Sequence, residues 1–244
     1  MQNATSPELS PHIPARIEAA AALLQRIERD FMPAVLANSF GAEDMVLMDL
    51  IARHAPGIGI FSLDTGRLNP ETYDLHQQAQ DRYGLKIDTY FPEASAIEAF
   101  VREEGMNAFY RSVELRKACC RIRKVEPLRR ALTGKRAWIT GLRREQSPTR
   151  TDLSEHEYDQ GFGLDKFNPL IDWTHGDVWE YIRAFDVPYN VLHDRHYPSI
   201  GCAPCTRAIS AGEDLRAGRW WWESPDSKEC GLHVRQPGEA AATA

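Results

Sequence analysis

The feature of this sequence that most constrains its fold is a regular alternation of short apolar runs with segments of helical periodicity. Apolar runs predict buried strands at residues 33–37, 58–63, 85–91, 136–141 and 167–173. Apolar residues at helical spacing predict helices at residues 15–30, 45–53, 70–83, 94–104, 107–132 and 177–185. Thr174 is predicted to cap the last of these helices. Strands and helices that alternate in this way predict an α/β fold with a doubly wound, mostly parallel sheet.

The loop after the first predicted strand is a candidate anion site. Ser39-Phe40-Gly41-Ala42-Glu43-Asp44 joins that strand to a helix. A strand, a tight turn and a helix in this order direct backbone N–H groups and the positive end of the helix dipole at an anion. The segment lacks the Gly-Lys-Ser/Thr of a Walker A loop and the GxGxxG of a dinucleotide fold. The residues alone leave two interpretations, an unusual anion-binding loop or a plain polar turn.

Other polar segments would lie close to this loop, because ligands bind outside the carboxyl ends of parallel strands. Asp64-Thr65-Gly66-Arg67 ends the second strand, and a cationic stretch at residues 143–150 follows the fourth. Guanidinium groups suit phosphate and sulfate, so that stretch is predicted either to bind such an anion or to form a mobile surface loop. Residues 107–132 are also basic, and most of such a charge run usually faces solvent.

The five cysteines divide into two pairs and one single residue. Cys119 and Cys120 are adjacent, Cys202 and Cys205 form a CxxC motif in a predicted loop, and Cys230 stands alone near the end of the chain. Four thiolates complete either a tetrahedral zinc site or an iron–sulfur cluster, and the alternative is a set of unrelated thiols. Adjacent cysteines favour the cluster, because a cluster offers a separate iron to each sulfur. Cys230 is then free for chemistry.

Composition and charge exclude several classes of protein. The net charge of −6 gives no basic field for nucleic acid, and no apolar run is long enough to span a bilayer. An odd number of cysteines without a secretory signal favours metal-binding and catalytic thiols in a reducing cytoplasm. We expect a disordered lead-in at residues 1–15, one α/β nucleotide-binding and cluster domain at 16–210, and a C-terminal segment with a mobile tail at 211–244.

Several motifs follow one another along the chain, namely Ser39-Phe40-Gly41-Ala42-Glu43-Asp44, Leu63-Asp64-Thr65-Gly66, Cys119-Cys120, the loop 143–150, Cys202-Ala203-Pro204-Cys205 and Lys228-Glu229-Cys230-Gly231-Leu232-His233. Together they resemble the assimilatory adenylyl-sulfate reductases, the iron–sulfur branch of the phosphoadenylyl-sulfate reductase family. The resemblance covers roughly residues 34–233. It implies a fold like that of the ATP pyrophosphatases (adenine nucleotide alpha hydrolase-like), and a [4Fe-4S] cluster on Cys119, Cys120, Cys202 and Cys205.

The resemblance also implies a reaction, which is the reduction of adenylyl sulfate to sulfite and AMP in sulfate assimilation toward cysteine. Cys230 would attack the sulfur and form a thiosulfonate, and thioredoxin or glutaredoxin would then release sulfite. The predicted cations for the phosphosulfate are Lys124, Arg143, Arg144, Arg216 and Arg219. The predicted adenosine pocket comprises Ser39, Phe40, Gly41, Leu63 and Thr65. His233 is expected to orient the anion or to tune the reactivity of Cys230.

Other functions stay open from the residues alone. Phosphoadenylyl sulfate is the alternative substrate within the family. An iron–sulfur ATP pyrophosphatase that thiolates tRNA is an alternative enzyme, and an iron–sulfur or zinc redox sensor with an exposed Cys230 is a non-enzymatic one. The run Trp220-Trp221-Trp222 is interpreted as a clamp over a site or as a contact between subunits of a homo-oligomer.

Overall fold

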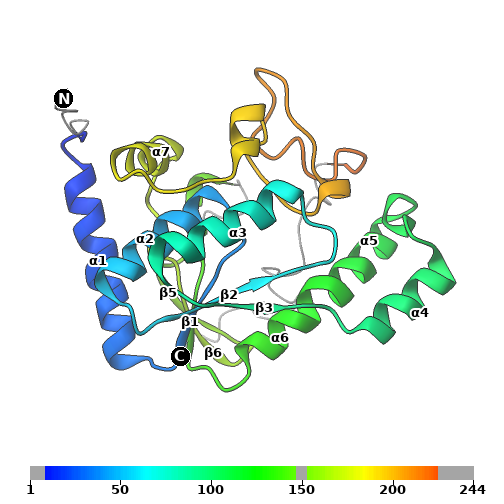
Figure 1. Ribbon diagram of the computed structural model, residues 1–244, viewed down its shortest axis with the longest axis horizontal. Helices are drawn as coiled ribbons and strands as arrows, with labels where there is room; N and C mark the ends of the chain where they lie inside the picture. Colours follow the sequence, from blue (N-terminus) through cyan, green and yellow to red (C-terminus); the bar gives the residue numbers. More distant parts are fainter. Residues whose placement is uncertain (1–8, 147–152, 225–244) are drawn as a thin grey trace, which may run out of the picture.

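A six-stranded sheet forms the centre of the molecule, and the predicted anion loop leaves it from a central strand. The computed structural model describes residues 9–146 and 153–224. Its strands are β1 (Ala34–Ala37), β2 (Gly59–Leu63), β3 (Ile87–Tyr90), β4 (Ala137–Ile139), β5 (His156–Asp159) and β6 (Leu164–Phe167). They lie in the order β3-β2-β1-β4-β6-β5, and every neighbouring pair is parallel except β5 with β6 (Figure 1). The predicted α/β fold with a mostly parallel sheet is therefore confirmed.

The helices follow the predicted segments closely. They are α1 (Ile13–Asp30), α2 (Ala42–His54), α3 (Pro70–Tyr83), α4 (Ala94–Glu104), α5 (Val113–Cys120), α6 (Glu126–Leu132) and α7 (His175–Ala184). The basic stretch predicted as mostly helical contains α5 and α6, which a five-residue π-helical turn at Arg121–Val125 joins directly. This turn follows the two cysteines at the end of α5, and such wide turns are frequent at functional sites.

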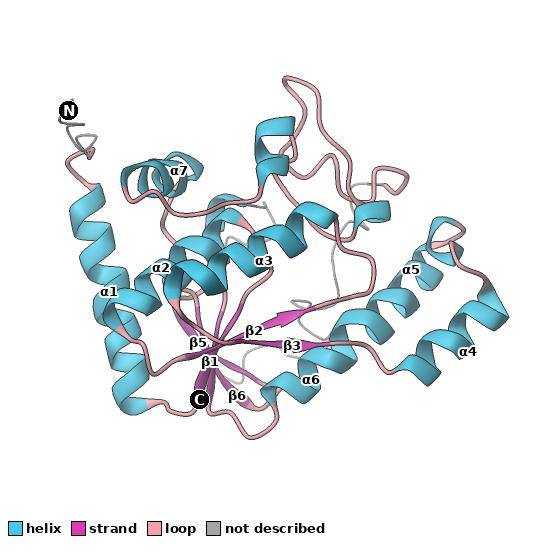
Figure 2. Ribbon diagram, in the orientation of Figure 1, coloured by secondary structure: helices cyan, strands magenta, loops and turns pink. Residues whose placement is uncertain are grey.

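The two faces of the sheet pack against different helices. Leu36 of β1 packs in a core with α1, α2, α3 and α7, whereas its neighbour Val35 packs with Leu128 and Leu132 of α6. Successive side chains of a strand point to opposite faces, so one apolar run supplies both cores. Figure 2 shows the same arrangement, with α1, α2, α3 and α7 on one side of the strands and α6 on the other. The doubly wound architecture is thereby built from short strands, of which β1, β2 and β4 are mostly apolar.

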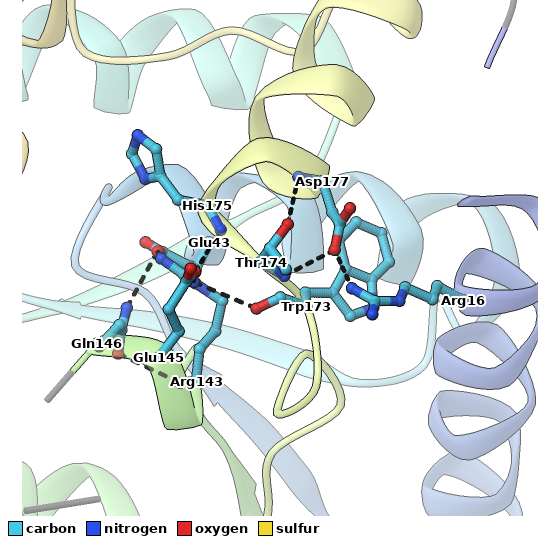
Figure 3. A network of polar contacts seen from close by, with 9 residues as sticks. All are labelled: Arg16, Glu43, Arg143, Glu145, Gln146, Trp173, Thr174, His175 and Asp177. Carbon is cyan, nitrogen blue, oxygen red and sulfur yellow. Dashed lines mark hydrogen bonds and ion pairs between the residues drawn. The ribbon is translucent and has the colours of Figure 1, made fainter. Parts of the chain in front are cut away.

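Helix α7 begins where the sequence predicts. The Thr174 hydroxyl accepts a hydrogen bond from the Asp177 N–H, and the Asp177 carboxylate accepts one from the Thr174 N–H at 2.7 Å (Figure 3). The same carboxylate contacts Arg16 and His12, which belong to the start of α1 or precede it. Asp177 is almost fully buried, so this capping box also fastens α1 to α7.

Two expectations for the ends of elements are wrong. The strand predicted at residues 167–173 ends at Phe167, because Asn168 and Leu170 accept turn hydrogen bonds from Ile171 and Trp173. The apolar residues of that run are buried by turns instead of by a strand. The lead-in expected to be disordered to residue 15 is helical from Ile13.

The β5–β6 hairpin was not predicted. Among the residues that the structure describes, no helix is both long and apolar enough to cross a membrane.

The capping box gives a test of how α7 is held. We expect Thr174→Ala to lower the free energy of unfolding by about 1 kcal/mol, because the Asp177 N–H loses its acceptor at the start of the helix. Thr174→Ser keeps a hydroxyl at the same place and serves as the matched control. Urea denaturation of both variants measures the difference. An unfolding midpoint for Thr174→Ala equal to that of the wild type would contradict the role of this cap.

Candidate active site

A cavity of about 290 Å³ lies at the carboxyl ends of β1, β2 and β4. Its walls come from the loop after β1, the ends of β2 and β4, and two segments near residues 198–201 and 215–220. All five residues of the predicted adenosine pocket line it, and these are Ser39, Phe40, Gly41, Leu63 and Thr65. Position and lining together make this cavity the candidate site for a small ligand.

The loop after β1 is bent by hydrogen bonds of its own side chains. The Asn38 side-chain oxygen accepts a hydrogen bond from the Phe40 N–H at 2.7 Å, and Phe40 has a φ of 60°. Asp44 accepts hydrogen bonds from both the N–H and the hydroxyl of Ser39, at 2.7 and 2.6 Å. Asparagine commonly supports such a left-handed turn by bonding the backbone two residues on. Gly41 is the N-cap residue of α2 and lines the cavity, so the amino end of this helix faces it.

Asp44 is buried between this loop and β4. Burial raises the pKa of the Asp44 carboxyl to about 6, although the hydrogen bonds from Ser39 act in the opposite direction. The backbone of Gly141, just after β4, passes directly beside it. A Cβ atom at Gly141 would overlap the Asp44 carboxylate and would lie 2.8 Å from the Glu43 Cβ. Glycine at this position therefore lets the loops after β1 and β4 close on each other.

Arg143 lines the cavity, but carboxylates already surround its guanidinium group (Figure 3). Its side chain is 2% exposed and lies 2.8 Å from Glu43 Oε1 and 2.8 Å from Glu145 Oε2. It also donates a hydrogen bond to the Trp173 carbonyl at 3.2 Å, and Gln146 donates to Glu43 at 3.0 Å. Two acidic partners neutralise its charge, so Arg143 is placed to hold the loops after β1 and β4 together.

The other predicted cations divide between the cavity and the surface. Lys124, Arg216 and Arg219 line the cavity. Arg219 is buried and packs so closely over Gly201 that a Cβ there would overlap its guanidinium group. Arg144 does not line the cavity. It forms an ion pair with Asp172 and donates a hydrogen bond to the Leu153 carbonyl at 3.2 Å.

A second, smaller cavity brings the four paired cysteines together. Its lining includes Cys119 and Cys120 from the end of α5 and Cys202 and Cys205 from the turn Ala203–Cys205 and the residue before it. Its other lining residues are Arg67, Phe109, Arg116, Arg123, Lys124 and Pro204. The cysteines are free thiols. Two sequence pairs from distant parts of the chain therefore meet in space.

Positive side chains surround these thiols and connect them to the first cavity. Burial raises the pKa of the Cys205 thiol to about 12. It also raises the pKa of Cys119, where the charge of Arg123 acts against it. The Thr65 hydroxyl lies 3.2 Å from the Cys202 sulfur, and Arg123 donates to the Thr65 carbonyl at 2.6 Å. Lys124 lines both cavities, so the thiol cluster and the ligand cavity share a wall.

The arrangement of the thiols bears on the kind of metal that they could hold. Within residues 9–146 and 153–224, no group of three or more His, Cys, Asp or Glu side chains converges tightly enough for a metal ion. The four thiols nevertheless border one cavity. A single zinc ion needs all its ligands within about 2.3 Å, whereas a cluster lets each sulfur bind a separate iron atom. The four thiols around this cavity make up the complete ligand set that either centre would need.

Some predicted residues lie outside the described part of the chain, and others were missed. Cys230 and His233 belong to residues 225–244, which the structure does not describe. The tryptophans differ from one another, since Trp220 is buried and lines the ligand cavity whereas Trp221 is 39% exposed. Cavity residues that the sequence did not single out are Glu43, Gln146, His175, Trp179 and His193. Glu43 and Gln146 belong to the two polar segments that follow β1 and β4, and both segments were predicted to lie near a bound anion. Their contacts with Arg143 could not be predicted from the sequence.

Comparison with known proteins agrees with this geometry. Residues 33–208 match the family described as phosphoadenosine phosphosulfate reductase domain. The chain is 55% identical over 234 residues to the adenosine 5'-phosphosulfate reductase of Burkholderia cepacia, covering 96% of this chain and 94% of that protein. A phosphoadenylyl-sulfate reductase from Candida auris, solved in complex with phosphate, has a TM-score of 0.67 and 28% identity, covering 84% of this chain and all of that one.

A more distant likeness concerns the fold alone. The FMN adenylyltransferase of Candida glabrata, solved with FAD and inorganic pyrophosphate, has a TM-score of 0.54 at 14% identity. It covers 91% of this chain and 80% of that one. The ATP-pyrophosphatase-like fold predicted from the sequence is therefore confirmed.

The close approach at Gly141 can be tested directly. We expect Gly141→Ala to lower the free energy of unfolding by about 1–3 kcal/mol, because the added methyl group overlaps Asp44 and Glu43. Gly176→Ala is the matched control, since its Cβ would lie 3.6 Å from the nearest atom, the Thr174 hydroxyl, in ordinary contact. Denaturant unfolding of both variants gives the comparison. Equal stability of the two variants would mean that the loops after β1 and β4 are not tightly apposed.

Proposed function

The chain belongs to the phosphoadenosine phosphosulfate reductase family, and we propose that it reduces adenylyl sulfate to sulfite and AMP in the assimilation of sulfate. The observation that carries the proposal is the joint presence of two adjoining cavities, one lined by the predicted nucleotide residues and one by four cysteines. Its 55% identity to an adenosine 5'-phosphosulfate reductase over nearly the whole chain supports the choice of substrate. The reaction belongs in a reducing cytoplasm, because it consumes free thiols.

The reaction needs one nucleophile and one external dithiol. The Cys230 thiolate attacks the sulfur of adenylyl sulfate, so that an S–S bond forms while the S–O bond to AMP breaks. AMP leaves with the electron pair of that bond. A dithiol protein, thioredoxin or glutaredoxin, then attacks the Cys230 sulfur and releases sulfite. Its second thiol resolves the mixed disulfide, so the dithiol is oxidised and the sulfur of the substrate is reduced.

The cavity offers distinct surfaces for the two halves of the substrate. Ser39, Phe40, Gly41, Leu63 and Thr65 are proposed to hold adenosine at the ends of β1 and β2. Lys124, Arg216 and Arg219 are proposed to neutralise the phosphosulfate and the departing phosphate, since they line the same cavity. For Arg143 and Arg144 the support is weaker, because carboxylates pair with both side chains. His233 stays a proposed partner of the anion or of Cys230.

The four paired cysteines fit a [4Fe-4S] cluster. We assign Cys119, Cys120, Cys202 and Cys205 as its ligands, because all four border one cavity and a cluster offers a separate iron atom to each of the adjacent cysteines. When bound, the cluster supplies positive iron that stabilises the buried thiolates. The nearby guanidinium and ammonium groups of Arg123 and Lys124 offset the negative charge of those thiolates. Attack and thiol exchange move electrons between sulfur atoms alone, so the cysteine site is proposed to act structurally and electrostatically.

The nucleophile is tested by Cys230→Ser. We expect sulfite release from adenylyl sulfate, measured anaerobically with reduced thioredoxin, to fall by about 10³-fold or more, because serine is not a nucleophile for this exchange. The variant should still bind AMP as the wild type does. Phosphoadenylyl sulfate is assayed in parallel, and a higher kcat/KM with it would overturn the proposed substrate. Full activity of Cys230→Ser would overturn the assignment of the nucleophile.

The cluster assignment is tested by Cys205→Ser. The wild type, purified anaerobically, should contain about four iron atoms per chain and absorb broadly in the visible range. We expect Cys205→Ser to lose most of this iron, because one thiolate ligand is missing. Cys230→Ser is the matched control and should keep its iron and colour. Zinc in place of iron in the wild type, or full iron in Cys205→Ser, would contradict the assignment.

A further inference from the structure

The described chain ends in a turn that is fastened to both cysteine-bearing segments. Trp220 donates a backbone hydrogen bond to the Cys205 carbonyl at 3.2 Å, and Glu223 donates one to the Trp220 carbonyl at 2.8 Å. The Glu223 carboxylate pairs with Arg116 of α5, the helix that ends in Cys119 and Cys120. We call residues 220–223 the tail root, because the segment with Cys230 follows it. The tail root thus touches both halves of the cysteine cavity.

The pair between Arg116 and Glu223 is bidentate and buried. Arg116 Nε lies 2.9 Å from Glu223 Oε1, and Arg116 Nη2 lies 2.8 Å from Glu223 Oε2. The two side chains are 0% and 3% exposed. The guanidinium carbon also lies 4.7 Å from the centre of the Trp220 ring. Two parallel bonds and a stacked ring define both the position and the direction of the tail root.

Stability alone is a poor reason for such a pair. Removing two charges from water costs several kcal/mol per ion, and apolar side chains of similar volume often stabilise a core equally well. The pair instead provides geometry, because two parallel hydrogen bonds fix one orientation of Glu223 relative to Arg116. Arg116 also lies three and four residues before the adjacent cysteines, so it shares their face of α5 and lines their cavity. The pair therefore links the tail root to the cysteine cavity.

We propose that the buried Arg116–Glu223 ion pair positions the C-terminal segment, so that Cys230 reaches the substrate from an origin fixed to the cysteine cavity. This inference rests on the proposed function. Arg116 and Glu223 are positioning residues, since they act through the placement of Cys230 and not on the substrate. The pair gives the four-cysteine site a second role, because the helix that carries two of its ligands also holds the base of the catalytic segment.

Chain length makes the origin of the segment matter. Cys230 lies seven residues after Glu223, so its backbone can reach at most about 25 Å from that anchor. If the pair is lost, the nearest described contact is the Trp222 ring, whose centre lies 4.5 Å from that of Tyr110, and the span to Cys230 grows from seven to eight residues. The effective concentration of a tethered group falls as about the −3/2 power of length, which here gives a decrease of only about 1.2-fold. The larger effect is expected from the lost direction, because the two bonds from Arg116 fix the orientation of the chain at Glu223.

The test uses Glu223→Gln in the full-length, iron-loaded protein. We expect the rate constant for AMP release in a single turnover to fall about threefold to tenfold, while the Kd for AMP stays within about twofold of the wild type. Iron content should be unchanged. Trypsin cleavage after Lys228, followed by mass spectrometry, should be faster in the variant, because the tail root is released. This second measurement does not depend on turnover.

Matched variants separate positioning from general destabilisation. Glu157→Gln breaks the partly buried pair with Lys166, 2.9 Å apart in the β5–β6 hairpin, and should leave both measurements at wild-type values. Glu223→Asp keeps the charge with a shorter reach and should give intermediate rates, and it replaces Glu223→Gln if that variant does not fold.

The outcomes distinguish this inference from the proposed function. A wild type that releases no AMP from adenylyl sulfate refutes the proposed function itself. An active wild type with Glu223→Gln at the same single-turnover rate and the same cleavage rate refutes the positioning role. Loss of iron in Glu223→Gln also refutes it, because the pair would then serve the cysteine cavity and not the tail root.

Discussion

The convergence of four thiols on one cavity, two of them buried, is the constraint on which the rest of this structure depends. Buried thiolates are costly, as the raised pKa of about 12 for Cys205 indicates, and they need positive charge nearby. Arg123 and Lys124 supply that charge from the turn that follows the cysteine pair. Bringing the CxxC segment onto α5 also places the segment around residues 215–220 over the carboxyl edge of the sheet. One requirement thereby organises both the cysteine cavity and the ligand cavity.

The cationic side chains around the two cavities have different roles, and these roles depend on which carboxylates lie beside each of them. Arg143 is enclosed by Glu43 and Glu145, so its charge holds two loops together. Arg116 is enclosed by Glu223 and holds the tail root. Lys124 lines both cavities and adjoins the proposed substrate and cluster sites at once. A count of arginines and lysines in the sequence contains none of these distinctions, because they depend on which carboxylate lies within about 3 Å.

The elements that sequence predicts well are those with local causes. Helix α3 begins at Pro70 and ends before Gly84, as its proline and glycine indicate. The cap at Thr174 is a local signal as well. The β5–β6 hairpin escaped prediction, because β5 carries polar residues on a sheet edge and lacks an apolar run. The run at residues 168–173 is apolar without being a strand, because the packed core buries it through turns.

The sequence by itself determined the alternation of strands and helices, the chemical types at the strand ends and the division of five cysteines into two pairs and one single residue. These features follow from the types of residue in a short segment and their spacing, which do not depend on the rest of the chain. The tertiary structure alone decided that the pairs share a cavity, that Lys124 joins two sites, and that Arg143 and Arg116 are neutralised by Glu43 and Glu223. The physical reason is that these electrostatic partners lie about a hundred residues apart, and only packing of the whole chain brings their charges into contact.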